Sequence, residues 1–251
     1  MKLSEKIAKW IKDKVQEAGA EGVVFGLSGG LDSSVVACLV RKALEDKALG
    51  LIMPCHSDPT DEKYALLVAK RFSIRTRRVD LGAVYEEFLK VLPPGRRVSL
   101  ANLKPRLRMI TLYYFANELN YLVAGTGNKS EISTGYFTKY GDGGVDILPI
   151  GGLLKTQVRK LAKELRIPEE IIRRAPTAGL WEGQTDEDEL GLSYEDLDRA
   201  ILAIESGRKG NLASAIMDKV EGLIKRSAHK RSPIPVFKPE ERLEEGNKMV
   251  R

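Results

Sequence analysis

The segment GVVFGLSGGLDSSVVACL, residues 22–39, joins a short apolar run, a glycine-rich turn and a helical pattern. The run at 23–27 predicts a buried strand, and Leu31, Val35 and Leu39 recur at helical spacing after the turn. A strand, a glycine-rich turn and a helix N-terminus together bind anions, because free backbone N–H groups and the helix dipole both favour negative charge. The segment therefore predicts a phosphate-binding turn in an α/β fold.

This turn differs from the most familiar phosphate loop in the residues at its end. The Walker pattern ends in Gly-Lys-Ser/Thr, whereas this turn ends in Gly30, Leu31, Asp32 and Ser33. A carboxylate thus stands where a lysine would face the phosphates. The string Ser-Gly-Gly-x-Asp-Ser is more restricted than a lone glycine-rich motif, which makes a chance strand–helix turn the weaker interpretation.

Composition limits the class of protein. A chain of 251 residues is long enough for one large α/β domain or two small ones. No apolar run approaches membrane-spanning length, and charges interrupt the N-terminal amphipathic helix, so we expect a cytoplasmic protein with reduced thiols and no membrane partner. The two cysteines, Cys38 and Cys55, form no CxxC or zinc pattern. The net charge of +6 fits an anionic partner, but with 30% charged residues it also fits an ordinary charged surface.

Strands and helices alternate along the first part of the chain. Apolar or alternating runs predict five strands, at 23–27, 48–54, 73–81, 121–126 and 145–150, with helical patterns between most of them. This order predicts a doubly wound, mostly parallel five-stranded sheet with helices on both faces, and ligands at the carboxyl ends of its strands. From about residue 155 the chain reads as helical. We expect a single domain over residues 1–251, with a flexible tail from about 238 and mobile loops at 135–144 and 176–192.

Several longer motifs give the chain a resemblance to a known family. GLSGGLDSS is similar to the pyrophosphate loop of the N-type ATP pyrophosphatases. The stretches NLKPRLRM, GTGNKSE, TGYFTKYGDGGVDILPIGGLLKTQVRKL, RAPTAGLWEGQTDEDELGLSYEDLD and HKRSPIP narrow the resemblance to the NAD synthetases, from the first helix to about residue 235. The resemblance implies an adenine nucleotide α-hydrolase-like fold, a homodimer, and ATP-dependent amidation of deamido-NAD by ammonia. That reaction passes through an acyl-adenylate and releases AMP and pyrophosphate.

The resemblance also implies roles for individual residues. Magnesium would supply positive charge beside the phosphates and takes oxygen ligands, which accounts for an aspartate in the turn. The metal ligands would be Asp32 and Glu131. ATP contacts carry over to Gly26, Leu27, Ser28, Gly29, Gly30, Leu31, Asp32, Ser33, Met53, Thr126, Lys155 and Thr177. Deamido-NAD contacts carry over to Arg106, Lys139, Asp146, His229 and Lys230. Catalytic roles are expected for Asp142, Asp146 and Lys155, with the two aspartates as the ammonium site and proton acceptor.

Two departures and two alternatives remain open at the level of sequence. Gly127-Asn128 stands where many bacterial members have Asp-His. The family's adenine-pocket side chains also cannot be matched securely to residues after the second predicted strand of this chain. A GMP-synthetase-like or tRNA-thiolating enzyme shares the Ser-Gly-Gly turn but not the TGYFTKYGDGG string. An RNA-binding protein would need aromatic stacking surfaces, and aromatic residues make up only 6% of the chain. We therefore expect no nucleic-acid partner, and free ammonia as nitrogen donor, with a separate glutaminase not excluded.

Overall fold

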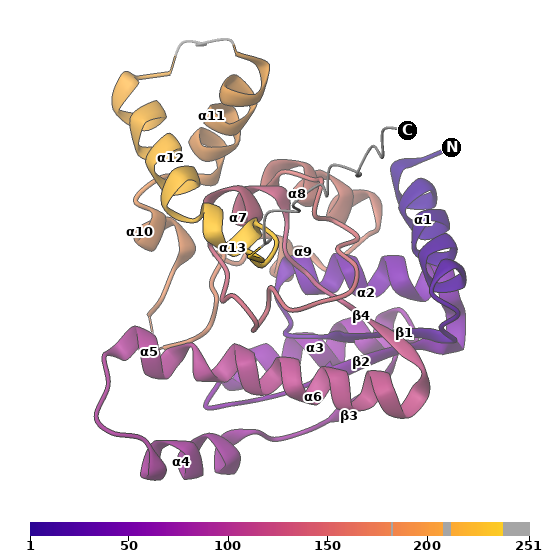
Figure 1. Ribbon diagram of the computed structural model, residues 1–251. Coiled ribbons are helices and arrows are strands. Elements are labelled where there is room, and N and C mark those ends of the chain that lie inside the picture. The colour runs from indigo at the N-terminus through magenta and orange to yellow at the C-terminus, as the bar shows by residue number, and fades with distance from the viewer. Residues whose placement is uncertain (182, 208–211, 238–251) are drawn as a thin grey trace, which may run out of the picture.

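The computed structural model describes residues 1–181, 183–207 and 212–237, and four parallel strands form its central sheet (Figure 1). They are β1 (Gly22–Gly26), β2 (Ala48–Ile52), β3 (Arg75–Arg78) and β4 (Tyr121–Ala124), in the order β3-β2-β1-β4. Val24 of β1 pairs with Leu49 of β2 on one side and with Val123 of β4 on the other. The chain runs outward from β1 to β3 and then returns to β4. The strand order reverses there, which leaves a crevice beside the carboxyl ends of β1 and β4.

Helices cover both faces of the sheet, because successive side chains of a strand point to opposite faces. Val23 and Phe25 of β1 belong to the core on one face, and Val24 belongs to the core on the other. The first face carries α1 (Leu3–Glu17), α2 (Leu31–Leu44), α3 (Pro59–Arg71), α8 (Lys155–Glu164) and α9 (Glu169–Ile172). The second face carries α4 (Gly82–Val91) and α6 (Leu103–Leu119), with the short α5 (Arg97–Ala101) packed against α6. The prediction of a parallel α/β sheet with helices on both faces is confirmed.

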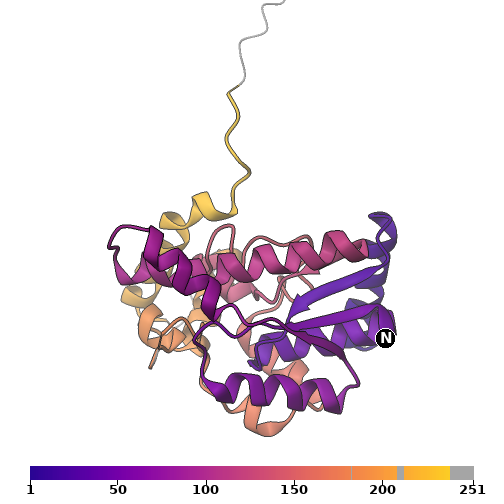
Figure 2. The same ribbon diagram turned by 90° about the horizontal axis from the view of Figure 1, so that it is seen from below.

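The remaining helices form a unit beside the sheet. They are α7 (Lys129–Thr134), α10 (Asp186–Leu190), α11 (Tyr194–Ser206), α12 (Ser214–Arg226) and α13 (Ala228–Arg231), and a 3-10 turn, η1 (Glu45–Lys47), precedes β2. Figure 1 shows α11 and α12 as an antiparallel pair that stands away from the sheet, and Leu197, Ile201 and Val220 lie in the core between them. In Figure 2 the segment after α13 leaves the body of the molecule. The tail expected from about residue 238 lies outside the described residues.

The prediction of a fifth strand at 145–150 was wrong. The segment forms a single bridge to the sheet, between Ala124 and Ile147. The bridge does not extend into a ladder, because the carboxylate of Asp146, rather than a backbone carbonyl, accepts the N–H of Val123 at 2.7 Å. The chain then turns, since the N–H of Gly151 donates to the carbonyl of Leu148 at 3.0 Å. The sheet therefore ends at β4. None of the helices in the described ranges is long and apolar enough to span a membrane.

Candidate active site

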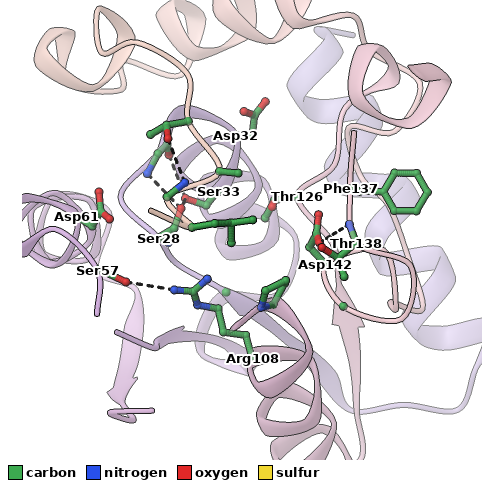
Figure 3. A pocket seen from close by; sticks show the side chains of 18 of the residues that line it. Ser28, Asp32, Ser33, Ser57, Asp61, Arg108, Thr126, Phe137, Thr138 and Asp142 are labelled. Atoms are coloured by element: carbon green, nitrogen blue, oxygen red, sulfur yellow. Dashed lines mark hydrogen bonds between the residues drawn. The ribbon is translucent and has the colours of Figure 1, made fainter. Parts of the chain in front are cut away.

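A cavity of about 1030 Å³ opens at the carboxyl ends of the strands. Such a volume lies at the upper end for small-molecule pockets, which run from about 300 to 1000 Å³. One side of the cavity is formed by the turn after β1 and the loop after β2, and the other by the segment 135–142 and by α13. Figure 3 shows Ser28 and Ser33 on the first side and Thr138 and Asp142 on the second. The cavity thus lies where the reversal of strand order predicts a ligand.

The turn after β1 is held in shape by its own serines. The Ser33 hydroxyl accepts the N–H of Ser28 at 3.2 Å and donates to the carbonyl of Gly30 at 3.0 Å. Gly29 has a φ of +80°, and a Cβ there would lie 2.2 Å from the carbonyl oxygen of Asp61 in α3. Gly29 therefore packs against α3 and does not line the cavity. The other sequence-predicted ATP contacts do line it: Gly26, Leu27, Ser28, Gly30, Leu31, Asp32, Ser33, Met53, Thr126, Lys155 and Thr177.

A buried ion cluster lies beside this turn. The ammonium of Lys155, only 3% exposed, donates to Asp32 and lies 3.3 Å from Glu131, and both carboxylate side chains are 16% exposed. Burial acts to lower the pKa of Lys155, but Asp32 and Glu131 together raise it above its ordinary value, which keeps the lysine protonated. Burial raises the pKa of Glu131, and the Lys155 ammonium opposes that rise. The cluster is therefore built around one cation.

Asn128, which stands where many family members have a histidine, has a structural role in this chain. Its side chain accepts the N–H of Glu131 at 3.1 Å, and its own N–H donates to the Glu131 carboxylate at 3.1 Å, a capping box that begins α7. Its amide nitrogen also donates to Asp32 at 3.2 Å. The asparagine thus orients both carboxylates, each of which keeps a second oxygen directed at Lys155.

The carboxylates fit a hard divalent cation. Their ligand atoms are oxygens, and a cation already sits between them in the form of the Lys155 ammonium. Within the described ranges, no group of three or more His, Cys, Asp or Glu side chains gathers around one point. The protein would therefore supply two ligands. Magnesium held by these two carboxylates would complete its ligands with water and phosphate oxygens, as it commonly does in nucleotide sites.

The second side of the cavity carries a carboxyl group among cations. Asp142 accepts the N–H of Thr138 at 2.9 Å (Figure 3). Asp142 is exposed, yet the surrounding protein desolvates its carboxylate enough to raise the pKa, and the hydrogen bond from Thr138 opposes that rise. Lys230 donates to the carbonyls of Gly135 and Phe137 at 2.7 and 2.8 Å. Arg106, Lys139 and His229 line the same side.

Comparison with known proteins agrees with this geometry. A family model described as NAD synthase matches residues 3–234. The chain belongs to the NAD synthase family. It is 48% identical over 233 residues to the "NH(3)-dependent NAD(+) synthetase" of Carboxydothermus hydrogenoformans. The aligned region covers 91% of this chain and 93% of that protein.

Solved structures of the family share the whole fold. The chain superposes on "NMN synthetase from Francisella tularensis" with a TM-score of 0.86 at 37% identity, over 95% of this chain and 97% of that one. The "NH3-dependent NAD synthetase from Campylobacter jejuni", in complex with the nitrate ion, gives a TM-score of 0.83 at 30% identity, over 94% and 98% of the two chains. The NAD synthase fold therefore accounts for nearly all of this chain.

Asp146, like Gly29, is a predicted site residue that does not line the cavity. Its carboxylate accepts from the Tyr113 hydroxyl at 2.9 Å and from the backbone of Val123, and it does not line the cavity that contains Asp142. The structure therefore does not bring the two aspartates together as a joint ammonium site. Asp146 is exposed on the outside of the family fold, where a second molecule could reach it.

Arg108 is a cavity residue that the motif analysis left unassigned. Its guanidinium donates to the carbonyl of Met53 and to the hydroxyl of Ser57, both at 3.2 Å, and burial lowers its pKa (Figure 3). Arg106, two residues earlier, donates to the carbonyl of Lys139 at 3.3 Å and is exposed. Both arginines line the cavity, although positions two apart on a helix face different sides.

The segment 174–181, which precedes α10, lines the cavity. Arg174 pairs with Asp61 at 2.6 Å, and Lys104 donates to the carbonyl of Leu180 at 2.9 Å. The guanidinium of Arg97 lies 4.4 Å from the ring centroid of Trp181. These contacts hold the segment 174–181 against α3, α5 and α6. Its expected movement, like that of 135–144, stays a prediction.

Proposed function

We propose that this protein is an ammonia-dependent NAD synthetase that amidates deamido-NAD at the expense of ATP. The observation that carries the proposal is one cavity with a glycine-rich turn and a carboxylate pair on one side and the carboxyl of Asp142 among cations on the other. Such a cavity suits a reaction that joins two anionic nucleotides. Membership of the NAD synthase family supports the same activity.

The proposed chemistry has two steps. The nicotinate carboxylate of deamido-NAD attacks the α-phosphorus of ATP, a P–O bond forms, and the bond to pyrophosphate breaks. Ammonia then attacks the acyl carbon, the C–N bond of NAD forms, AMP leaves with the bridging oxygen, and a proton is lost. The protein must therefore hold pyrophosphate as a leaving group, align the two nucleotides and accept one proton.

Residues of the first side would hold the triphosphate. The Ser28–Ser33 turn would bind the β- and γ-phosphates at the N-terminus of α2. Asp32 and Glu131 would hold magnesium, which supplies positive charge to the phosphates when bound. Lys155 adds an ammonium at the same place, since its carboxylate partners keep it protonated. Met53, Thr126 and Thr177 border the same region and are proposed ATP contacts.

Residues of the second side would hold deamido-NAD and handle the proton. Arg106, Lys139, His229 and Lys230 offer donors to an anionic dinucleotide. Asp142 is the proposed proton acceptor when ammonia attacks, because its raised pKa brings it closer to neutral pH than an ordinary carboxylate. Asp146 is proposed to contact deamido-NAD from outside the cavity, where a second subunit could complete the site.

The cysteines argue for free ammonia as the nitrogen source. A glutaminase needs an activated thiolate, but Cys38 and Cys55 are both buried. Burial raises the pKa of Cys38 to about 12, and burial also raises that of Cys55. A separate glutaminase could still deliver ammonia. Purified chain should form NAD from ammonium but not from ammonia-free glutamine, and equal turnover on both would contradict this part of the proposal.

We further propose a cytoplasmic homodimer in which residues 1–251 act as one catalytic unit. Exposed apolar side chains on α4, α5 and α6, including Phe88, Val91, Val98, Ile110 and Tyr114, offer a surface for a second copy. Sedimentation equilibrium at micromolar concentration tests the dimer. A monomer at these concentrations would contradict it.

The direct test of the function is product analysis. The chain is incubated with ATP, Mg²⁺, ammonium and deamido-NAD, and NAD, AMP and pyrophosphate should appear in equal amounts. Formation of ADP and phosphate, or no product, would refute the proposal. A second candidate, amidation of nicotinic acid mononucleotide, is favoured by the similarity to a structure named NMN synthetase. The ratio of kcat/KM for the two substrates decides between them.

A further inference from the structure

The helix α8 begins with a residue that its own dipole disfavours. Lys155 is the first residue of α8, and its first turn contains no acidic side chain. The N-cap, Leu154, forms no side-chain hydrogen bond to the helix. Because a helix N-terminus carries partial positive charge and unpaired N–H groups, a buried lysine there needs compensation from elsewhere.

Asp32 and Glu131 neutralise the ammonium, and two further side chains from other helices accept the N–H groups at the start of α8. The hydroxyl of Ser130, from α7, accepts the N–H of Lys155 at 3.0 Å. The carboxylate of Asp198, from α11, accepts the N–H of Thr156 at 2.9 Å. Ser130 in turn donates to the other oxygen of Asp198. Ser130 is fully buried and Asp198 is only 3% exposed, so the pair caps α8 away from solvent.

The same pair reaches the ion cluster from both directions. Ser130 directly precedes Glu131 in α7, and Lys155 is the first residue of the turn that the pair caps. One helical turn before Asp198, α11 also places Tyr194, and the Lys155 ammonium lies 5.0 Å from the centroid of its ring. Helix α11 therefore contacts the backbone of α8 at Thr156, next to Lys155, and the Lys155 side chain through the ring of Tyr194.

We propose that Asp198, acting through Ser130, is a positioning residue that fixes Lys155 and Glu131 for MgATP. This inference rests on the proposed function, because it concerns how the phosphate side of that site is held. Neither residue lines the cavity, so neither touches substrate. Their effect passes through the start of α8 and through α7.

The substitution Asp198→Asn tests the link with a minimal change of volume. In the parent, Ser130 and Thr156 each donate to a different oxygen of Asp198. An asparagine has one acceptor oxygen and one NH₂ group, so it can accept only one of these two hydrogen bonds in the same geometry. It also removes the negative charge at the N-terminus of α8. Ser130→Ala removes the hydroxyl that joins Asp198 to Lys155.

The matched control is Glu205→Gln. Glu205 also lies on α11 and links it to α7 through Lys129 at 2.6 Å, but this pair is at the surface. A carboxylate-to-amide change there alters one α11 contact without touching α8. If the mere attachment of α11 mattered, the control would behave like Asp198→Asn.

The experiment measures kcat, the two KM values, MgATP binding by calorimetry, and thermal unfolding of the full chain, with assays well below the melting temperature. We expect Asp198→Asn and Ser130→Ala each to lose roughly 10–100-fold in kcat/KM for MgATP, the size usual for groups that orient metal-site residues. We expect calorimetric MgATP affinity to fall as well. The KM for deamido-NAD should stay within about 2-fold, and the double variant should lose much less than the product of the single losses, because the two residues act as a unit.

Three outcomes would overturn the inference. First, a folded Ser130→Ala variant could keep its MgATP affinity and its kcat/KM within about 2-fold of the parent. That result would exclude a positioning role for Ser130 even if Asp198→Asn fails to fold. Equal KM rises for both nucleotides, or an equal loss in Glu205→Gln, would indicate a general structural effect. If the unsubstituted chain forms no NAD, the proposed function fails, but the calorimetric comparison still decides the positioning role.

Discussion

Replacing Lys155 by methionine tests the claim that the ion cluster is built around a cation. The substitution keeps an unbranched side chain, one atom shorter, but leaves Asp32 and Glu131, each 16% exposed, without the ammonium between them. Leaving a buried charge without its partner costs about 3–5 kcal/mol. Glu131 can escape part of this cost by binding a proton, so we expect the lower end, about 3 kcal/mol.

That loss corresponds to a fall in melting temperature of roughly 6–12 °C for a chain of this size. The assay is urea and thermal unfolding in EDTA and in Mg²⁺. Magnesium should stabilise Lys155→Met more than the parent, because the ammonium no longer competes for the carboxylates. The control Lys129→Met removes an exposed ion pair and should cost no more than about 1 kcal/mol. A Lys155→Met variant within about 1 kcal/mol of the parent in EDTA would refute the reasoning.

Three further predictions concern the turn and the thiols. Asp32→Ala should stay folded but lose about 100-fold or more in magnesium-dependent turnover, and an unchanged rate over a range of Mg²⁺ would exclude the metal role. Gly29→Ala should destabilise the chain by about 2 kcal/mol or more in urea unfolding, because φ is +80° and the new Cβ would meet the Asp61 carbonyl at 2.2 Å; an unfolding midpoint equal to the parent's would count against that packing. At pH 8, iodoacetamide should label Cys38 only after denaturation, because burial keeps the thiol protonated with a pKa of about 12, and rapid labelling of the native chain would contradict this.

The secondary structure could be predicted from the sequence wherever local propensity and hydrophobic periodicity agree with tertiary contacts. The strand, turn and helix over residues 22–39 appear as β1, the phosphate turn and α2, because propensity and burial favour the same structure there. The prediction of a fifth strand was wrong because of a side-chain contact that the alternation of apolar residues cannot reveal. VDILPI alternates like a strand, but the side chain of Asp146 takes the N–H of Val123 that an extended ladder would use.

The sequence named many of the residues that line the cavity but not the contacts between them. The motifs named Asp32, Glu131 and Lys155, yet nothing in the sequence shows that the lysine sits on the two carboxylates. The Ser130–Asp198 pair was missed because its members are 68 residues apart and each looks like an ordinary polar residue in a helix. Spacing on one element reports which residues share a face, whereas contacts between elements depend on how those elements pack.

The most direct test of the central claim follows oxygen atoms through the reaction. Deamido-NAD labelled with ¹⁸O in both oxygens of its nicotinate carboxylate is incubated with the chain, ATP, Mg²⁺ and ammonium, and AMP and NAD are analysed by mass spectrometry. Attack of the carboxylate on the α-phosphorus predicts one ¹⁸O in the phosphate of AMP and one in the amide of NAD. Formation of NAD with no ¹⁸O in AMP would contradict the account, because the acyl-adenylate could not then be the intermediate.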